Sequence, residues 1–257
     1  MDFQEFDRSI YRELGINLEA YKPAQLHRRI ESLMNRLYIK KLNEFFIKIK
    51  TDSEIKQKFL DFITINVTEF FRNPEIFKDF QSIVKNEFLT KGEKLKIWSA
   101  ACSIGCEPYS IAMFLNENSK GSFLKHKIIA TDIDRTILKR AKEAIYSENE
   151  IKNISNNDLN KYFKKVNDKY NLEDSIKRMV EFRNHDLISD AYESDFDVIV
   201  CRNVVIYFNN DVKDKIYKNF VKSLKKGGIL FVGATESIYN YRDYGLEKAS
   251  TFIYRKL

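Results

Sequence analysis

The chain of 257 residues contains few residues that interrupt helices or cross-link a fold: eight glycines, three prolines and three cysteines. No glycine lies between Gly15 and Gly92, so this interval lacks the residue that tight turns favour and is expected to be helical. Cys102, Cys106 and Cys201 are an odd number of cysteines, with too few histidines at metal-ligand spacing. They are therefore expected to be reduced thiols, with no disulfide framework and no metal site.

Long apolar runs are also absent. No run approaches the length that spans a bilayer, and the first residues are acidic where a secretory signal would be basic and then apolar. A cytosolic protein without membrane insertion is therefore expected. A hydrophobic content of 44% is enough for the core of one large or two modest domains. The net charge of +7 suits an acidic partner, either nucleic acid or protein, without choosing between them.

Apolar residues in the first 63 positions recur at steps of three and four, which predicts amphipathic helices. The recurring sets are Phe3, Phe6, Ile10 and Leu14; Leu26, Ile30, Leu33 and Leu37; Phe45, Phe46 and Ile49; and Phe59, Phe62 and Ile63. We expect residues 1–63 to form an all-helical domain, and residues 64–92 to form a linker helix region.

From Leu95 onward, short β-rich runs alternate with helical segments, which predicts a mainly parallel sheet covered on both faces. Residues 93–257 are therefore expected to form a doubly wound, Rossmann-like α/β domain. Strands are predicted at 95–101, 127–131, 196–201 and 228–233, with helices at 110–115, 135–145 and 212–224 and a terminal strand pair within 246–256. The irregular stretch at about 161–182 is expected to be a small inserted β subdomain.

Two polar features follow predicted strands. The loop after Ala100 consists largely of small residues and leads to Pro108, which suits the first turn of a helix. Such a loop lets a ligand approach the backbone at the carboxyl end of a strand, although it equally suits a plain tight turn, and the dinucleotide glycine pattern is absent. Asp132 ends the next strand, where a carboxylate accepts ribose hydroxyls, whereas Asp134 is better placed to cap the following helix.

The strand at 196–201 opens directly into Arg202, Asn203 and Tyr207. These polar groups are expected over the same edge of the sheet as the ribose acid, unless they only satisfy loop carbonyls. Another distinctive segment runs from Asn66 to Arg72, in which the two phenylalanines are typical of a core and the arginine of a surface.

Together these segments resemble the CheR family of chemotaxis receptor methyltransferases over nearly the whole chain. The resemblance implies a methyltransferase that uses S-adenosyl-L-methionine, releases S-adenosyl-L-homocysteine and forms glutamate methyl esters on the cytoplasmic helices of methyl-accepting chemotaxis receptors. The segments that carry it are residues 66–72, 98–113, 130–146, 180–187, 196–208 and 224–237.

The resemblance also implies a role for each matched residue. One set lines the cofactor and catalytic cleft: Asn66, Thr68 and Arg72. A second set binds the cofactor: Glu107 at the methionine amino group, Asp132 at the ribose, Asp186 and Leu187 beside the adenine, and Arg202 with Asn203 completing the pocket. Arg72 and Tyr207 are the catalytic candidates, with Tyr207 near the transferred methyl group. Cys106 departs from the family pattern, because many relatives carry a second acid there and a thiol does not replace a carboxylate as an acceptor.

A glutamate side chain is already ionised near neutral pH, since its ordinary pKa is about 4.3, so methyl transfer needs no strong base and positioning should dominate. The candidate docking residues on the helix expected at 22–37 are Lys22, Arg28, Arg29 and Arg36. Lys22, Gln25, Arg29, Ser32 and Arg36 form a stripe largely opposite the apolar face. This stripe is complementary to glutamate-bearing receptor helices, although a run of charges often only meets solvent.

Two other functions are compatible with these patterns. A nucleic-acid methyltransferase would share the cofactor fold and the basic surface, but the chain has no recognisable nucleic-acid-binding module and the basic stripe has no interleaved aromatics. A non-catalytic cofactor-binding signalling module would keep the binding residues without turnover. The glycine pattern disfavours a nicotinamide oxidoreductase.

Overall fold

The computed structural model describes residues 1–64, 68–119 and 126–257. The chain divides into two compact units. The helical unit comprises Met1–Asn66 and Val204–Lys215, and the sheet unit comprises Val67–Asn203 and Ile216–Leu257. Within the described residues, no helix is both long and apolar enough to cross a membrane. Asn66, one of the expected site residues, lies outside the described part of the chain.

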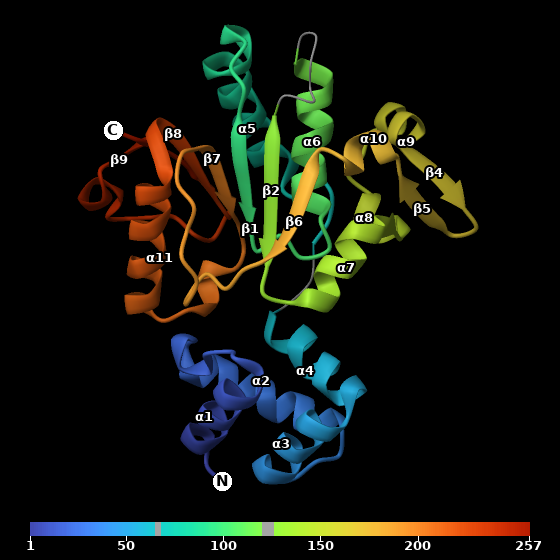
Figure 1. The fold of residues 1–257 in the computed structure, drawn as a ribbon, viewed down its shortest axis with the longest axis vertical. Helices are drawn as coiled ribbons and strands as arrows, with labels where there is room; N and C mark the ends of the chain where they lie inside the picture. The colour runs from blue at the N-terminus through green and yellow to red at the C-terminus, as the bar shows by residue number, and fades with distance from the viewer. Residues whose placement is uncertain (65–67, 120–125) are drawn as a thin grey trace. The chain divides into compact units, whose positions relative to one another are not determined.

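The helices of the first unit lie close to one another (Figure 1) and share an aromatic core. They are α1 (Phe3–Leu14), α2 (Pro23–Arg36), α3 (Leu42–Thr51) and α4 (Ser53–Thr64). Helix α1 begins where the Asp2 side chain accepts the Glu5 N–H, and ends at Gly15, whose φ of 73° suits glycine. Phe6, Phe45 and Phe59 are fully buried, with ring centroids 5.9 to 6.2 Å apart. The expected helices are thus confirmed.

Val204–Lys215 groups with the helical unit, although residues 93–257 were expected to form one domain. The backbone explains the difference. Tyr21 pairs with Phe208 as an isolated antiparallel bridge, and the Lys22 N–H donates to the Tyr207 carbonyl at 2.9 Å. The Asn209 N–H also donates to the Ala20 carbonyl at 2.9 Å.

The sheet unit is built on a seven-stranded sheet with the order β6-β2-β1-β7-β8-β10-β9. The parallel strands are β1 (Lys96–Ala100), β2 (Lys127–Asp132), β6 (Val180–Asn184), β7 (Phe196–Cys201) and β8 (Leu224–Val232). The antiparallel edge consists of β9 (Leu246–Ser250) and β10 (Ile253–Lys256). This confirms the doubly wound prediction and the terminal strand pair. The hydrophobic pattern did not predict β6, because its buried and exposed residues alternate instead of forming an apolar run.

Helices pack on both faces of this sheet (Figure 1). They include α5 (Pro74–Glu87), α6 (Cys106–Asn118), α7 (Arg135–Glu143) and α11 (Asn210–Ser223). On one face, Phe80 of α5 stacks on Phe231 of β8 at 4.9 Å. On the other face, Phe220 of α11 meets Trp98 of β1 edge-on at 5.4 Å. Successive side chains of a strand point to opposite faces, so each strand contributes to both hydrophobic layers.

A small antiparallel sheet is inserted between α7 and β6, with the order β3-β5-β4. Its strands are β3 (Ile145–Tyr146), β4 (Phe163–Val166) and β5 (Lys169–Leu172), and the short helices α8 (Glu148–Ile151), α9 (Asn156–Tyr162) and α10 (Asp174–Lys177) accompany them. The inserted β subdomain was expected at about 161–182. It begins earlier because β3 pairs with β5, and it ends earlier because Val180 pairs with Ile128 in the main sheet.

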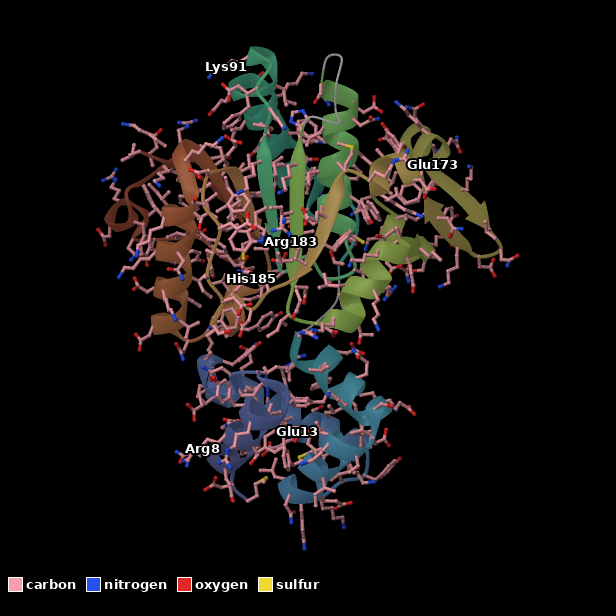
Figure 2. The ribbon with its side chains drawn as sticks, in the orientation of Figure 1. Arg8, Glu13, Lys91, Glu173, Arg183 and His185 are labelled. Carbon is pink, nitrogen blue, oxygen red and sulfur yellow. The ribbon has the colours of Figure 1, made fainter. Side chains whose placement is uncertain are left out.

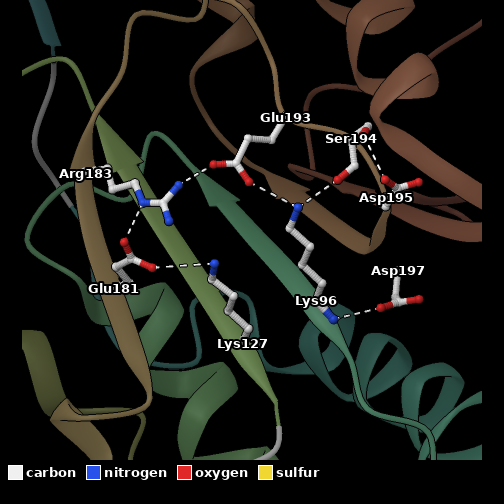
Figure 3. Close-up of polar contacts among 8 residues, drawn as sticks. All are labelled: Lys96, Lys127, Glu181, Arg183, Glu193, Ser194, Asp195 and Asp197. Atoms are coloured by element: carbon white, nitrogen blue, oxygen red, sulfur yellow. Dashed lines mark hydrogen bonds and ion pairs between the residues drawn. The ribbon is translucent and has the colours of Figure 1, made fainter.

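Charged side chains tie the loop after β6 to β1 and to β6 itself, and also join β6 to β2 (Figure 3). Glu181 interacts with Lys127 of β2 and with Arg183 of its own strand, and Arg183 in turn reaches Glu193 in the loop. Glu193 also pairs with Lys96 of β1 at 3.1 Å. Arg183 and His185 mark this end of β6 in Figure 2. These pairs are largely solvent-exposed, so they hold the loop in register more than they stabilise the fold.

Candidate cofactor-binding site

The loop from β1 to α6 has an unusual backbone. Ala101, Ser103 and Gly105 have φ values of 62°, 50° and 87°. A Cβ at Gly105 would lie 3.1 to 3.2 Å from side chains of α6, α7 and β6, so this turn requires glycine both for its conformation and for space. Pro108 lies in the first turn of α6, as expected. The small residues therefore allow a close approach of backbone to the carboxyl end of β1.

Asp132 ends β2 and is only 6% exposed. Its Oδ2 accepts the Ser103 N–H at 2.9 Å, and its Oδ1 accepts the Asp134 N–H at 3.1 Å. Burial raises the pKa of Asp132 to about 6. A carboxylate has about four acceptor positions, so Asp132 keeps acceptor capacity for a ribose hydroxyl. Asp134 caps α7 through the N–H groups of Thr136 and Ile137, as expected, whereas the ribose contact of Asp132 stays a prediction.

Glu107, in the first turn of α6, provides a second acid close to the same loop. Its Oε1 accepts the Ser99 hydroxyl at 2.8 Å, and its Oε2 is 3.5 Å from Nη1 of Arg202. Burial raises the pKa of Glu107, and the positive charge of Arg202 opposes that shift. A cationic amino group bound beside Glu107 would favour the ionised carboxylate in the same way.

Arg202 follows β7, and its side chain is only 2% exposed. Its Nη2 donates to the Arg72 carbonyl at 2.9 Å and to Asn73 Oδ1 at 3.0 Å. Its guanidinium also lies over the Phe231 ring, 4.7 Å from the centroid. Burial lowers the pKa of Arg202. The side chain thus joins three segments of the site, those carrying Arg72, Glu107 and β7.

Asn203 has a φ of 62°, which few residues other than glycine adopt. Its Oδ1 is buried and has no hydrogen-bond partner among the described residues. Buried polar atoms are nearly always hydrogen-bonded, so this unpaired acceptor suits a ligand that brings a donor. S-adenosylmethionine carries an ammonium group, two ribose hydroxyls and an adenine amino group, and the residues present fit it.

The adenine candidates lie in the loop after β6. Asp186 accepts the Ile188 N–H and the Ser189 hydroxyl, each at 2.8 Å, so its carboxylate shapes its own turn. Leu187 is buried, and its carbonyl accepts the Tyr192 hydroxyl. The His185 N–H donates to the Asp132 carbonyl at 3.1 Å, which places this loop next to the ribose acid. The adenine contact itself remains a prediction.

The segment before α5 is anchored by its two phenylalanines. Phe70 is fully buried against Tyr146 and Phe163, with centroid distances of 4.8 and 5.4 Å, as expected for a core residue. The Phe71 N–H donates to Ser110 Oγ at 3.0 Å. Thr68 and Arg72 flank this pair and remain partly exposed. The backbone of Arg72 is thus fixed by the Arg202 hydrogen bond, the buried Phe70 and the Phe71 hydrogen bond to Ser110.

The helical unit holds the remaining candidates, and some of them line a small pocket. Its lining includes Lys22, Gln25 and Arg29 of the α2 region together with Tyr207. Arg29 Nη2 donates to the Phe62 carbonyl, its guanidinium lies 4.7 Å from the Phe62 ring centroid, and burial lowers its pKa.

The docking candidates therefore differ in their surroundings. Lys22, Arg28 and Arg36 are exposed, whereas Arg29 is held against α4. The apolar face opposite them is largely buried, as expected for Leu26, Ile30 and Leu33.

Cys106 is fully buried in the hydrophobic core, and burial raises its pKa well above the usual range. The thiol is therefore neutral and does not contribute polarity to the β1–α6 loop.

Sequence reasoning missed three polar contributors: Ser99, Ser103 and Glu236. Glu236 had a detectable signal, because it is an acid that follows an apolar strand, β8, which ends at Val232.

The doubly wound sheet, the buried Asp132 that ends β2 and the second acid beside the small-residue loop fit the class of S-adenosylmethionine-dependent methyltransferases. The chain belongs to the CheR methyltransferase family. The all-alpha domain of that family matches residues 1–64, and its SAM binding domain matches residues 66–253. The resemblance stated from the motifs is thereby confirmed, and S-adenosylmethionine is the cofactor.

Curated relatives match along nearly the whole chain. A chemotaxis protein methyltransferase of Listeria monocytogenes is 40% identical over 99% of this chain and 97% of its own length. The chemotaxis protein methyltransferase Cher2 of Pseudomonas putida is 34% identical, covering 95% of this chain and 93% of its own. A chemotaxis protein methyltransferase of Salmonella typhimurium is 30% identical, with 99% and 90% covered.

Proposed function

We propose that this chain methylates glutamate side chains on the cytoplasmic helices of methyl-accepting chemotaxis receptors, forming glutamate methyl esters. The observation that carries the proposal is the 40% identity, over nearly the full length of both chains, to a relative described as a chemotaxis protein methyltransferase. The exposed cations of the α2 region support an acidic protein substrate, because they are complementary to glutamate-bearing helices.

The cofactor supplies an electrophilic methyl group on a sulfonium ion. In the proposed reaction the chain's own residues mainly bind and orient the reactants. Asp132 accepts hydrogen bonds from the ribose hydroxyls, and Glu107 balances the charge of the amino group. Arg202 holds Glu107 and the Arg72 backbone in one arrangement. Arg72 orients charged groups by charge-assisted hydrogen bonding, and Tyr207 shapes the surroundings of the methyl group.

No general base is required, because the attacking group is a glutamate carboxylate whose ordinary pKa of about 4.3 leaves it ionised near neutral pH. An RNA or DNA nucleophile would usually have to lose a proton as it reacts. The site residues proposed here include two buried acids and two arginines, and the acids already serve the cofactor. This distribution of roles favours a carboxylate substrate.

The test is methyl transfer from radiolabelled S-adenosylmethionine to receptor cytoplasmic fragments, with RNA as a parallel substrate. We expect alkali-labile label on the receptor fragment, because a methyl ester hydrolyses to methanol. Replacing the modified glutamates by alanine should abolish the signal, whereas replacing unmodified glutamates on the same helices should not. Label on RNA, or alkali-stable label on the fragment, would contradict the proposal.

A further inference from the structure

A buried carboxylate lies beyond the carboxyl ends of β7 and β8. These parallel strands are in register at Cys201 and Val232, so Arg202 and Gly233 are the next residues along each strand. Glu236 follows three residues later and is only 5% exposed. A carboxylate is rarely this buried unless specific partners surround it.

Glu236 links the two strand ends through one oxygen. Its Oε2 accepts the Asn203 N–H at 2.6 Å and the Gly233 N–H at 2.8 Å. Both bonds are short and charge-assisted, and they satisfy two backbone donors that the parallel ladder leaves unpaired. The carboxylate therefore fixes the separation between Asn203, which follows Arg202, and Gly233, which follows β8.

Gly233 leaves the space that this arrangement requires. A Cβ at position 233 would overlap Glu236 Oε2 and would lie 2.9 Å from the Asn203 nitrogen. These neighbours include backbone and a buried carboxylate, neither of which moves easily. Glycine is needed here for close approach, since its φ does not lie in the left-handed region.

The group held in place is Asn203. Its backbone adopts a left-handed conformation that L residues avoid unless their surroundings enforce it. Its Oδ1 is the buried acceptor without a partner among the described residues, and its neighbour Arg202 reaches Glu107. The Glu236 carboxylate holds this conformation by accepting the Asn203 N–H. Its second hydrogen bond, from the Gly233 N–H, keeps the carboxylate itself in place.

We propose that Glu236 is a positioning residue for the cofactor pocket, holding the Asn203 backbone so that Asn203 Oδ1 accepts a donor of S-adenosylmethionine. This inference rests on the proposed role of Asn203 in cofactor binding. Glu236 itself does not touch the reacting atoms. It acts by keeping a strained backbone in the conformation that presents the asparagine acceptor.

The test compares S-adenosylhomocysteine affinity by calorimetry, below the unfolding temperature, for the wild type and three variants. Glu236→Ala removes both hydrogen bonds, and we expect affinity to weaken about 10- to 100-fold. Glu236→Gln should restore affinity to within about threefold of wild type, because a single amide oxygen can accept both N–H groups. Gly233→Ala should weaken affinity as Glu236→Ala does, because its methyl group displaces the carboxylate.

Asp197 provides a matched control. It is 6% exposed, lies at the amino end of the same strand β7, and accepts the Lys96 N–H at 2.7 Å and the Lys225 ammonium at 2.6 Å. Asp197→Ala should lower the melting temperature and leave S-adenosylhomocysteine affinity within about twofold, because it is remote from the strand ends. A loss of affinity equal to that of Glu236→Ala would reduce Glu236 to a general stabiliser and overturn the inference.

A kinetic split gives a second readout. Glu236→Ala should raise KM for S-adenosylmethionine while KM for the receptor fragment stays near wild type. Folded Glu236→Ala and Gly233→Ala proteins with wild-type affinity would overturn the inference. If Glu236→Ala does not fold, the S-adenosylhomocysteine affinity of Gly233→Ala alone tests the inference. A wild type that binds S-adenosylhomocysteine but methylates no receptor glutamate would refute the proposed substrate and leave this inference standing. A wild type that binds no S-adenosylhomocysteine would refute both.

Discussion

At the scale of single residues, we expect Asp132, the proposed ribose acid, to determine how cofactor binding responds to acid. The folded-state pKa of about 6 lies above the ordinary value of 3.8, because burial disfavours the charged form. Ribose hydroxyls donate to the ionised carboxylate, so bound cofactor should lower that pKa. In the ligand-free protein, by contrast, the protonated form of Asp132 is favoured. Its contribution to the free energy of unfolding is therefore fully present below pH 3.8 and is lost as pH rises through about 6.

We therefore expect S-adenosylhomocysteine affinity to be nearly constant above pH 7 and to fall by up to about tenfold per pH unit below pH 6. Calorimetric titrations between pH 5 and pH 8 measure this. Asp132→Asn should bind more weakly and lose the part of the slope centred near pH 6. An unchanged slope in Asp132→Asn would assign the titration to another group, with Glu107 the nearest candidate because burial raises its pKa too.

We expect the Arg72 side chain to contribute to catalysis far more than to the stability of the fold. Arg72→Ala removes the guanidinium but keeps the carbonyl that accepts Arg202 Nη2, so the anchored backbone should persist. We expect kcat to fall about 10- to 100-fold, the value of a lost charge-assisted hydrogen bond, and the free energy of unfolding to fall by less than about 1 kcal/mol. Single-turnover methylation measures the effect on catalysis, and urea unfolding measures the free energy of unfolding. Near-normal turnover would remove Arg72 from the catalytic residues.

At the scale of secondary-structure elements, the α2 region presents its cations unequally. Arg28 and Arg36 are exposed, whereas Arg29 donates to the Phe62 carbonyl of α4. Charge reversal at Arg28 and Arg36 should raise KM for receptor fragments about tenfold, with the effect shrinking at high salt, and should leave S-adenosylhomocysteine affinity unchanged. The matched control reverses Lys40 and Lys41, two exposed cations that follow α2, for the same change in net charge. An equal rise in KM for the control would attribute the effect to overall charge.

Arg29→Glu has a different expected outcome. It removes a partly buried hydrogen bond and places a carboxylate beside a carbonyl, so the free energy of unfolding should fall by about 1–3 kcal/mol. Thermal or urea unfolding measures this directly. Wild-type stability in Arg29→Glu would show that the contact with α4 does not contribute to stability. Arg29 would then be grouped with Arg28 and Arg36 as a docking candidate.

At the scale of the whole molecule, the residues proposed to bind the cofactor, among those that the structure describes, lie in the sheet unit, and the basic residues of the α2 region lie in the helical unit. Ligand binding stabilises the structure that contains its site. S-adenosylhomocysteine at 100 times its Kd should therefore add about 2.7 kcal/mol to the unfolding of the sheet unit. Differential scanning calorimetry with and without ligand tests this. If two transitions are resolved, only that of the sheet unit should shift, and equal shifts of both would contradict the prediction. A single transition would show that the units unfold together.

Much of this architecture follows from local patterns. Helical spacing of Phe3, Phe6 and Ile10 predicts α1, and the apolar run at 196–201 predicts β7, because each element buries a face that its own residues define. Asp132 and Asp134 were correctly divided between a strand end and a helix cap for the same reason. The strand β6 was missed because Val180–Asn184 alternates between buried and exposed positions and carries little local signal.

Tertiary structure alone decided the rest, because those features depend on residues far apart in the chain. Val204–Lys215 joins the helical unit through backbone bonds to Ala20 and Lys22. Arg29 is removed from the exposed stripe by Phe62, and the Cys106 thiol is withdrawn into the core. Glu236 gains its partners only when β7 and β8 lie side by side. Periodicity specifies which face of an element is buried, whereas long-range contacts determine which polar side chains meet there.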